Sequence, residues 1–182
     1  PQDRQLVEAV RRRSGATIRV DANAGWTPDE AIEMSAFLKD MDVEFIEQPL
    51  PADDGEGIRA IQGRMALPIM ADESCHLPED VGGCAPYYDA INIKLMKCGG
   101  ITPARAMIRE ARQLGLKIMI GCMTETSVGI SAAAQLLPLV DYADIDGPFL
   151  LKEDPAEGVW LEDGKVFYPD SPGNGGVVAL TG

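Results

Sequence analysis

The sequence lacks any apolar run near the roughly 18 residues that a membrane-spanning helix needs. Its charged start, PQDRQLVEAVRRR, is not a signal peptide. It also has little positive charge: lysine and arginine total 16 against 29 aspartates and glutamates, and the net charge is −13. Because nucleic acid and anionic membranes would both repel such a surface, neither is expected as a partner.

Two further absences narrow the class of protein. The four cysteines, Cys75, Cys84, Cys98 and Cys122, form no CxxC pair, and we interpret them as reduced thiols of a cytoplasmic protein. No GxGxxG or GxxxxGKS/T motif follows the first expected strand, which removes the commonest reason to expect a nucleotide-binding sheet.

What is present is an alternation of short apolar runs and helical segments. The apolar runs are typical of buried strands and recur with a period of roughly 25 residues, the length of one βα unit. They cover residues 17–20, 43–46, 68–71, 90–93, 117–120 and 140–144. Between them, Thr27 to Glu30 has the composition of a capping box that begins a helix, and Thr102-Pro103 begins another that stops at Gly115.

Short, uniformly apolar strands separated by helices are typical of a parallel α/β sheet covered on its faces. The pattern leaves two architectures open, a doubly wound sheet and a (β/α) barrel, and the even period favours the barrel. Only six strands are visible where such a barrel needs eight, and residues 3–15 resemble a helix that follows an upstream strand. We therefore expect residues 1–150 to form part of a barrel.

The C-terminal residues 151–182 leave this repeat and form a second segment. Within it, residues 158–169 predict a β-hairpin that turns at Asp163-Gly164, and residues 170–177 predict a loop.

Ionisable residues stand where four successive expected strands end. They are Asp21, Glu47, Asp72 and Lys94. In a parallel barrel the carboxyl ends of the strands share one face, where active sites are found. One acidic residue at a strand end is usually a turn former or helix cap. Three in successive units would repel one another unless a cation lay between them, and all-oxygen ligands favour Mg²⁺.

Lys94 ends an otherwise apolar strand. Crowded by a divalent cation and poorly solvated, its pKa should be lowered, which would make it a general base near neutral pH; the alternative is an ion-pair partner of the carboxylates. Lys97 is expected to be a loop residue or the partner of a nearby acid.

At these residues the sequence resembles the enolase superfamily, and within it the muconate lactonizing enzyme subgroup. The matching segments are VDANAGW (20–26), FIEQPL (45–50), ADES (71–74) and INIKLMKCGG (91–100). The resemblance implies a modified (β/α)7β barrel with a separate capping domain. This chain would hold strands three to eight of that barrel, without the first two strands and the N-terminal capping domain. Residues 151–182 would be a candidate part of the capping region.

Residue by residue, the resemblance implies that Asp21, Glu47 and Asp72 hold Mg²⁺ and that Lys94 is an acid/base catalyst. The shared step of the superfamily is abstraction of the proton α to a carboxylate, which gives an enediolate.

Three acidic residues near the last strands are candidate substrate contacts. Asp144 and Asp146 share a face of the last strand by alternation, and two carboxylates there suit a cationic group. This pair resembles the feature by which dipeptide epimerases hold the substrate's free ammonium. Glu125, after the preceding strand, would either contact substrate or cap a helix.

The resemblance therefore implies a Mg²⁺-dependent dipeptide epimerase of the L-Ala-D/L-Glu type, with a dipeptide as its partner. The alternatives are a cycloisomerase, an o-succinylbenzoate synthase or an N-acylamino acid racemase of the same subgroup, whose substrates lack a free ammonium, or an inactive barrel module. One departure is that no Lys-x-Lys motif, the source of the subgroup's second lysine, lies upstream of Asp21. This chain alone is therefore expected to be inactive, and the open edge of a partial barrel predicts a homo-oligomer.

Overall fold

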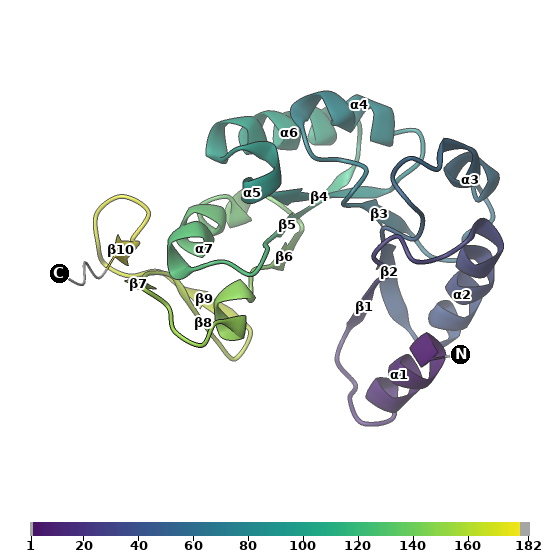
Figure 1. Ribbon diagram of the computed structural model, residues 1–182, viewed down its shortest axis with the longest axis horizontal. Coiled ribbons are helices and arrows are strands. Elements are labelled where there is room, and N and C mark those ends of the chain that lie inside the picture. The colour runs from purple at the N-terminus through teal and green to yellow at the C-terminus, as the bar shows by residue number, and fades with distance from the viewer. Residues whose placement is uncertain (1, 179–182) are drawn as a thin grey trace.

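The computed structural model describes residues 2–178 and shows a parallel sheet curled into an arch, with helices along its outer side (Figure 1). The six strands of this sheet are all parallel and follow one another in sequence order. They are β1 (Ile18–Asp21), β2 (Val43–Glu47), β3 (Ile69–Ala71), β4 (Ala90–Lys94), β5 (Lys117–Gly121) and β6 (Tyr142–Asp144). A doubly wound sheet reverses its strand order, whereas a barrel does not. The prediction of a partial barrel is therefore confirmed.

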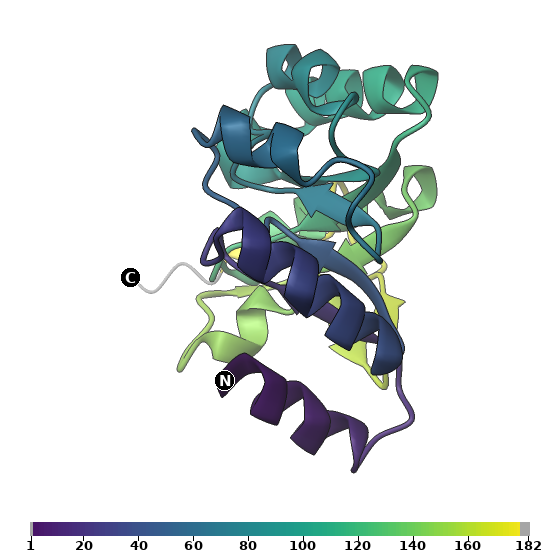
Figure 2. The same ribbon diagram turned by 90° about the vertical axis from the view of Figure 1, so that its right-hand side faces the viewer.

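Helices α1, α2, α3, α4 and α6 follow one another along the outer side, from α1 at the bottom of Figure 2 to α4 and α6 at its top. The α-helices are α1 (Gln2–Arg11), α2 (Pro28–Asp40), α3 (Gly55–Ala60), α4 (Val81–Cys84), α5 (Leu95–Cys98), α6 (Ile101–Gln113) and α7 (Ser127–Ala134). Single 3₁₀ turns are η1 (Pro78–Asp80), η2 (Leu137–Leu139) and η3 (Gly147–Leu150). No helix among residues 2–178 has both the length and the apolar character to cross a membrane.

Local signals explain where the two longest helices begin. The predicted capping box is present in α2, where the Glu30 carboxylate accepts from the Thr27 N–H at 2.8 Å and the Thr27 hydroxyl accepts from the Glu30 N–H. Helix α6 begins at Ile101, one residue before the predicted start, because Gly100 takes the N-cap position at φ 118°. Glycine adopts such a positive φ at little cost.

The two faces of the sheet carry different side chains because residues along a strand alternate. The outward residues are isoleucines no more than 3% exposed that pack in the main core with the helices: Ile46, Ile69, Ile91, Ile93, Ile118 and Ile120. On the concave side, Phe45, Met70, Ala90 and Met119 form a second cluster with Tyr142. The rings of Phe45 and Tyr142, from the non-adjacent strands β2 and β6, meet at 5.1 Å between centroids. The sheet is thus curled tightly enough for its inner face to bury side chains.

The C-terminal segment is built from short antiparallel pairs. Strands β8 (Trp160–Glu162) and β9 (Lys165–Phe167) form the predicted hairpin, with positive φ at Asp163 and Gly164. The predicted loop 170–177 is wrong at its end, because β10 (Val177–Val178) pairs with β7 (Ala156–Glu157).

The last barrel strand is shorter than the predicted 140–144 and begins at Tyr142. The carboxylate of Asp141 instead accepts hydrogen bonds from the Ile118 N–H at 2.8 Å and from Arg112 at 2.6 Å. These contacts hold the residue as a turn before the strand.

Candidate active site

The strand ends place the predicted ionisable residues on one face of the sheet. Asp21, Glu47 and Lys94 are the last residues of β1, β2 and β4, and Asp72 directly follows β3. The strand register sets Asp21 opposite Glu47, and it sets Lys94 opposite Gly121, which in turn lies opposite Asp144. All four residues therefore point toward the carboxyl end of the arch, as the sequence predicts.

Glu47 is a buried carboxyl, 6% exposed, at the centre of this group. Its pKa is raised to about 7, first by burial and then by the negative charges of Asp21 and Asp72, while a hydrogen bond from Asn92 and the charge of Lys94 oppose the rise. The Asn92 amide donates to its Oε1 at 2.7 Å. A carboxyl whose charged form is disfavoured in this way is one that a bound cation would stabilise.

Asp72 is 2% exposed and is held by two lysines. The ammonium of Lys94 donates to Oδ2 at 2.8 Å and that of Lys97 donates to Oδ1 at 2.7 Å. Lys97 lies one turn beyond Lys94, in α5, so the expectation that it pairs with a nearby acid is confirmed and the loop placement is wrong.

The predicted lowering of the Lys94 pKa concerns a lysine crowded by a bound cation and stays a prediction, whereas the protein's own groups shift this pKa the other way. Burial alone would lower the pKa of Lys94, but the hydrogen bond and charge of Asp72, together with the charges of Glu47 and Asp21, raise it above its ordinary value. The lysine is therefore an ammonium in contact with a carboxylate, which is the ion-pair arrangement considered for it.

Asp21 lies at the edge strand β1 and is exposed. Its Oδ1 accepts from the Asn23 N–H at 2.8 Å, and Asn23 takes a positive φ of 47°. A cavity of about 370 Å³ brings Asp21 together with Glu47 and Asp144, over the apolar Phe45 and Met119. The cavity is also lined by Thr17 and Arg19, and the Arg19 guanidinium lies over the Phe45 ring, so its lining mixes polar and apolar groups.

The donor chemistry of this site fits Mg²⁺, although the structure does not draw the ligands into a coordination cluster. Within residues 2–178, no three histidine, cysteine or acidic side chains lie close enough together to hold a metal ion jointly. Both carboxylate oxygens of Asp72 instead face lysines. Two buried oxygens have no hydrogen-bond partner among the described residues. They are Oε2 of Glu73, the residue after Asp72, and Oδ1 of Asn92, two residues before Lys94. The roles of Asp21, Glu47 and Asp72 as ligands stay a prediction.

Asp144 and Asp146 flank the buried Ile145 and are both exposed. The strand ends at Asp144 and Asp146 precedes the turn η3, so their position on one face stays a prediction. The pKa of Asp144 is raised, first by burial of its carboxyl and then by the charge of Asp146, while the charge of Lys94 lowers it. A carboxylate whose charge is disfavoured by a neighbouring carboxylate is suited to a cationic group, and the contact of Asp144 and Asp146 with substrate stays a prediction.

Glu125 does not cap helix α7. Its Oε1 accepts from the Met123 N–H at 3.0 Å, while the helix start is capped by Asp154, which accepts from the Ser127 N–H at 2.8 Å and from its hydroxyl at 2.7 Å. Of the two roles considered for Glu125, only substrate contact stays a prediction.

Sequence reasoning missed Asn92 and Gln48. Asn92 stands two residues before Lys94 on the same strand, so alternation already placed it on the face of the site. Gln48 follows Glu47 and is fully buried. In the motif FIEQPL, only the glutamate has a charge that indicates a metal ligand, so the sequence gives no sign of a role for Gln48.

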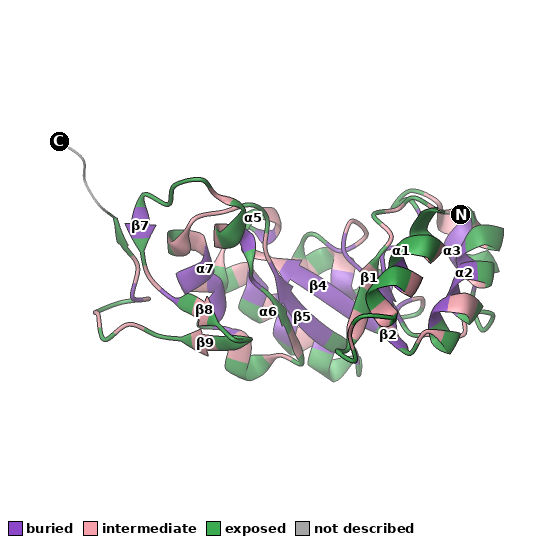
Figure 3. Ribbon diagram, turned by 90° about the horizontal axis from the view of Figure 1, so that it is seen from below, coloured by how far each residue is buried: buried purple, intermediate pink, exposed green. Residues whose placement is uncertain are grey.

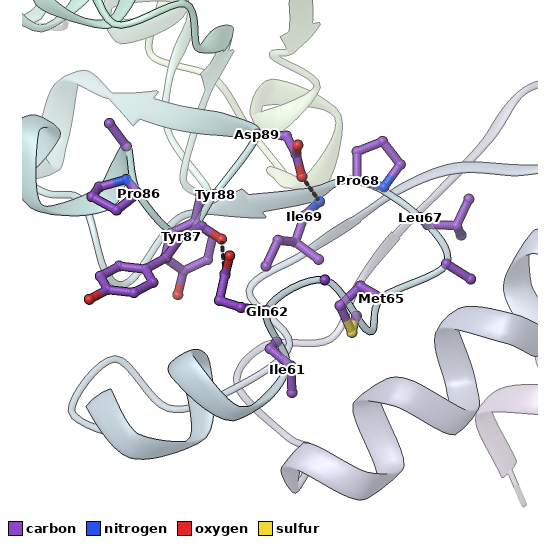
Figure 4. Close-up of a pocket in the computed structure, with 13 residues that line it drawn as sticks. Ile61, Gln62, Met65, Leu67, Pro68, Ile69, Pro86, Tyr87, Tyr88 and Asp89 are labelled. Atoms are coloured by element: carbon purple, nitrogen blue, oxygen red, sulfur yellow. Dashed lines mark hydrogen bonds between the residues drawn. The ribbon is translucent and has the colours of Figure 1, made fainter.

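Another cavity, of about 450 Å³, lies where β3 and β4 begin (Figure 4). Its polar groups are occupied by internal bonds: the Gln62 amide donates to the Tyr87 carbonyl at 2.9 Å, and the Asp89 carboxylate accepts from the Ile69 N–H at 2.9 Å. Because chemistry in parallel barrels is found at the carboxyl ends of the strands, this cavity belongs to the structural end.

Known proteins show the same fold. The chain matches the enolase C-terminal domain-like family over residues 1–179. It is 51% identical over 174 residues to an L-Ala-D/L-amino acid epimerase of Maribacter sp., an alignment covering 95% of this chain and 52% of that protein. The substrate-liganded L-Ala-D/L-Glu epimerase of Bacillus subtilis superposes with a TM-score of 0.91 at 34% identity, covering 98% of this chain and 53% of that one.

A third comparison bears on ligands. A dipeptide epimerase of Enterococcus faecalis V583, solved with Mg and the dipeptide L-Leu-L-Tyr, has a TM-score of 0.88 and 37% identity, over 96% of this chain and 52% of that one. The chain spans about half the length of the curated relatives it matches. By the extent of these matches, the chain belongs to the enolase C-terminal domain-like family.

Proposed function

We propose that this chain is the barrel half of a Mg²⁺-dependent dipeptide epimerase. The observation that carries the proposal is the convergence of Lys94 with the carboxylates of Asp21, Glu47 and Asp72 at the strand ends, where the charges of Asp21 and Asp72 raise the pKa of both Glu47 and Lys94. The names of the relatives and the Mg- and dipeptide-bound structure support the same reading.

In this proposal Asp21, Glu47 and Asp72 are the residues that hold Mg²⁺. When bound, the ion would stabilise the negative charge that develops as the proton α to the carboxylate leaves, the established chemistry of the superfamily. Lys94 moves that proton at its Nζ. Its contact with Asp72 holds it as an ammonium, the form that delivers a proton to one face of the substrate.

Asp144 and Asp146 would hold the free ammonium of the dipeptide. Their exposure on either side of the buried Ile145 and the raised pKa of Asp144 support this role, because a cation would relieve the repulsion that Asp144 meets from Asp146.

Epimerisation needs a second acid/base group on the opposite face of the substrate. The family resemblance assigns this role to a lysine upstream of Asp21, and no lysine precedes Asp21 in this sequence. The proposed activity is therefore that of a polypeptide in which this chain is joined to the other half of the enzyme, and the chain alone is proposed to be inactive as an epimerase.

The test joins this chain to the upstream half of the Maribacter epimerase and follows epimerisation of L-Ala-L-Glu by NMR in D₂O. We expect activity that is lost on chelation and restored by Mg²⁺. Lys94→Met should lower kcat by about 100-fold or more, the usual contribution of a positioned acid/base group. The matched control is Lys117→Met, which removes an exposed lysine that bonds Tyr142 at the other end of β5. Activity that survives chelation would show the metal assignment to be wrong.

The role of the aspartate pair separates a dipeptide epimerase from the alternatives in the subgroup, whose substrates carry no ammonium. Asp144→Asn and Asp146→Asn should raise KM for L-Ala-L-Glu and leave the reaction with N-acetyl-L-Ala-L-Glu at its already low rate. Equal effects on both substrates would favour an N-acylamino acid racemase or another member of the subgroup.

Two wider properties belong to the same proposal. We expect a cytoplasmic protein, which the four free cysteines support. We also expect a homo-oligomer, because the edge strand β1 presents unpaired backbone groups to a neighbour.

A further inference from the structure

Gln48 occupies an unusual place for a polar residue. It is 0% exposed, it directly follows Glu47, and its φ of +34° is rare for a residue with a side chain. A buried amide in a conformation of this kind persists only where its surroundings hold it.

The side chain of Gln48 uses all of its hydrogen-bonding capacity. Its Nε2 donates to the Leu50 carbonyl at 2.7 Å and to the Ser74 hydroxyl at 2.9 Å. Its Oε1 accepts from the Asp72 N–H at 2.9 Å and from the Ser74 N–H at 3.2 Å. A glutamine amide offers two donors and one oxygen with two lone pairs, so every position is filled.

These bonds continue the β2–β3 pairing beyond the point where the strands end. The register of the two strands runs as far as Glu47 opposite Met70, and the Gln48 N–H still donates to the Met70 carbonyl at 2.8 Å. Past that point the backbones are joined through the Gln48 side chain, which reaches Asp72 and Ser74. Beyond the end of the paired strands, the Gln48 side chain therefore provides the hydrogen bonds that join the two segments carrying Glu47 and Asp72.

The backbone of Gln48 also contacts the loop that follows β1. Its carbonyl accepts from the Ala24 N–H at 2.7 Å, in the loop that follows Asp21. One buried residue therefore contacts the segments that carry all three candidate metal-binding residues. Its own side chain is fully buried and fully hydrogen-bonded, so it has no position left to bind a metal or a substrate.

We propose that Gln48 is a positioning residue that fixes the mutual placement of Asp21, Glu47 and Asp72 for the binding of Mg²⁺. The inference rests on the proposed function, because it assigns to Gln48 a part in the metal site of that function. Residues that orient metal ligands from behind are commonly worth a factor of about 10 to 100 in metal affinity.

The test measures Mg²⁺ affinity in the 182-residue chain by calorimetry, at a temperature where circular dichroism shows every variant folded. Gln48→Met keeps the length of the side chain and removes its four hydrogen bonds, and we expect Mg²⁺ to bind about 10- to 100-fold more weakly. Gln48→Asn is one methylene shorter and keeps the amide; it should also weaken binding, and it carries the test if the methionine variant does not fold.

The matched control is Ser131→Ala. Ser131 is likewise fully buried, and its hydroxyl accepts from the Val159 N–H at 2.9 Å, far along the chain from the site. This variant should lower the unfolding temperature and leave Mg²⁺ affinity unchanged. A second readout needs no metal: the amide NMR signals of Asp72 and Ser74 should shift and exchange faster with solvent in Gln48→Met but not in Ser131→Ala.

The outcomes separate the inference from the function on which it rests. If the unchanged chain binds Mg²⁺ and both Gln48 variants bind it equally well, the inference is overturned while the proposed function stands. If the unchanged chain binds no Mg²⁺, the proposed metal site is overturned and the inference with it. Weaker binding in both variants, with normal binding in Ser131→Ala, supports the inference.

Discussion

The centre of the curled sheet and its two edges hold their acidic residues in different ways. At the centre, Glu47 and Asp72 are 6% and 2% exposed, and each is bonded by a side chain from β4 or α5. At the edges, Asp21 on β1 and Asp144 on β6 are exposed. Figure 3 shows the same contrast in the burial of whole elements: the residues of β4 and β5 are mostly buried, whereas those of β1 and α1 are largely exposed.

This difference shows which residues of the site are held in place by neighbouring strands and helices. A strand with neighbours on both sides and helices behind it holds its end residues in one arrangement, as for Glu47 and Asp72. An edge strand supports its end residue from one side alone, so Asp21 and Asp144 depend on local contacts such as the bond from the Asn23 N–H. The centre therefore sets the geometry of the site, and the edges stay open to a substrate or a neighbouring chain.

The largest expected effect is on the core behind the central strands. Ile93 of β4 is 0% exposed, and Ile93→Ala should lower the free energy of unfolding by about 3 kcal/mol, through lost burial and the cavity left behind. The matched change at the edge, Ile18→Ala in the half-buried β1, should cost about 1 kcal/mol. Urea unfolding followed by circular dichroism measures both values. Equal losses would contradict the contrast between centre and edge.

The second effect concerns the ion pairs. Asp72→Asn leaves the ammonium groups of Lys94 and Lys97 without their shared counter-charge, and stability should fall by about 2 kcal/mol. This lies below the value for fully buried pairs because the two lysine side chains keep 13% and 18% exposure. Asp21→Asn, at the edge, should change stability by less than about 0.5 kcal/mol. The same unfolding experiment checks both, and a smaller loss for Asp72→Asn than for Asp21→Asn would refute the idea of a fixed centre.

The third effect tests how the glycine on β5 makes room for the site. A Cβ on Gly121 would lie closer to the Asn92 amide than van der Waals contact allows. Gly121→Ala should therefore push Asn92 away from Glu47 and cost about 1.5 kcal/mol. In an Asn92→Ala background this cost should shrink, which a double-mutant cycle measures. Gly83→Ala in α4, where nothing lies within 4 Å of the added methyl, is the control.

Much of the fold could be predicted because its signals are local. The alternation of strands and helices and the capping box at Thr27 can each be recognised from residues close together in the sequence, and both are confirmed. The strand-end positions of Asp21, Glu47 and Asp72 also follow, since they depend only on where each strand stops.

What could not be predicted depends on contacts between distant residues. The direction of the Lys94 pKa shift depends on its 2.8 Å contact with Asp72, and the cap of α7 comes from Asp154, 27 residues from Ser127. Gln48 was missed because its importance lies in bonds to Asp72 and Ser74 across the strand ends, which no local pattern reveals.

The smallest expected effect is at the far edge and depends on pH. The pKa of Asp144 is raised above its ordinary value near 3.8, by burial of its carboxyl and then by the charge of Asp146, so its ionised form is less stable in the folded chain than in the unfolded one. Asp144→Asn should therefore stabilise the chain slightly at pH 7, by no more than about 0.5 kcal/mol because solvent screens this exposed pair. The gain should vanish as the pH falls below the ordinary aspartate range, where Asp144 is protonated in both states. Thermal unfolding of the two proteins from pH 7 to pH 3 measures the difference. A loss of stability at pH 7 that disappears as the pH falls would mean that Asp144 is held by a cation instead of repelled by Asp146.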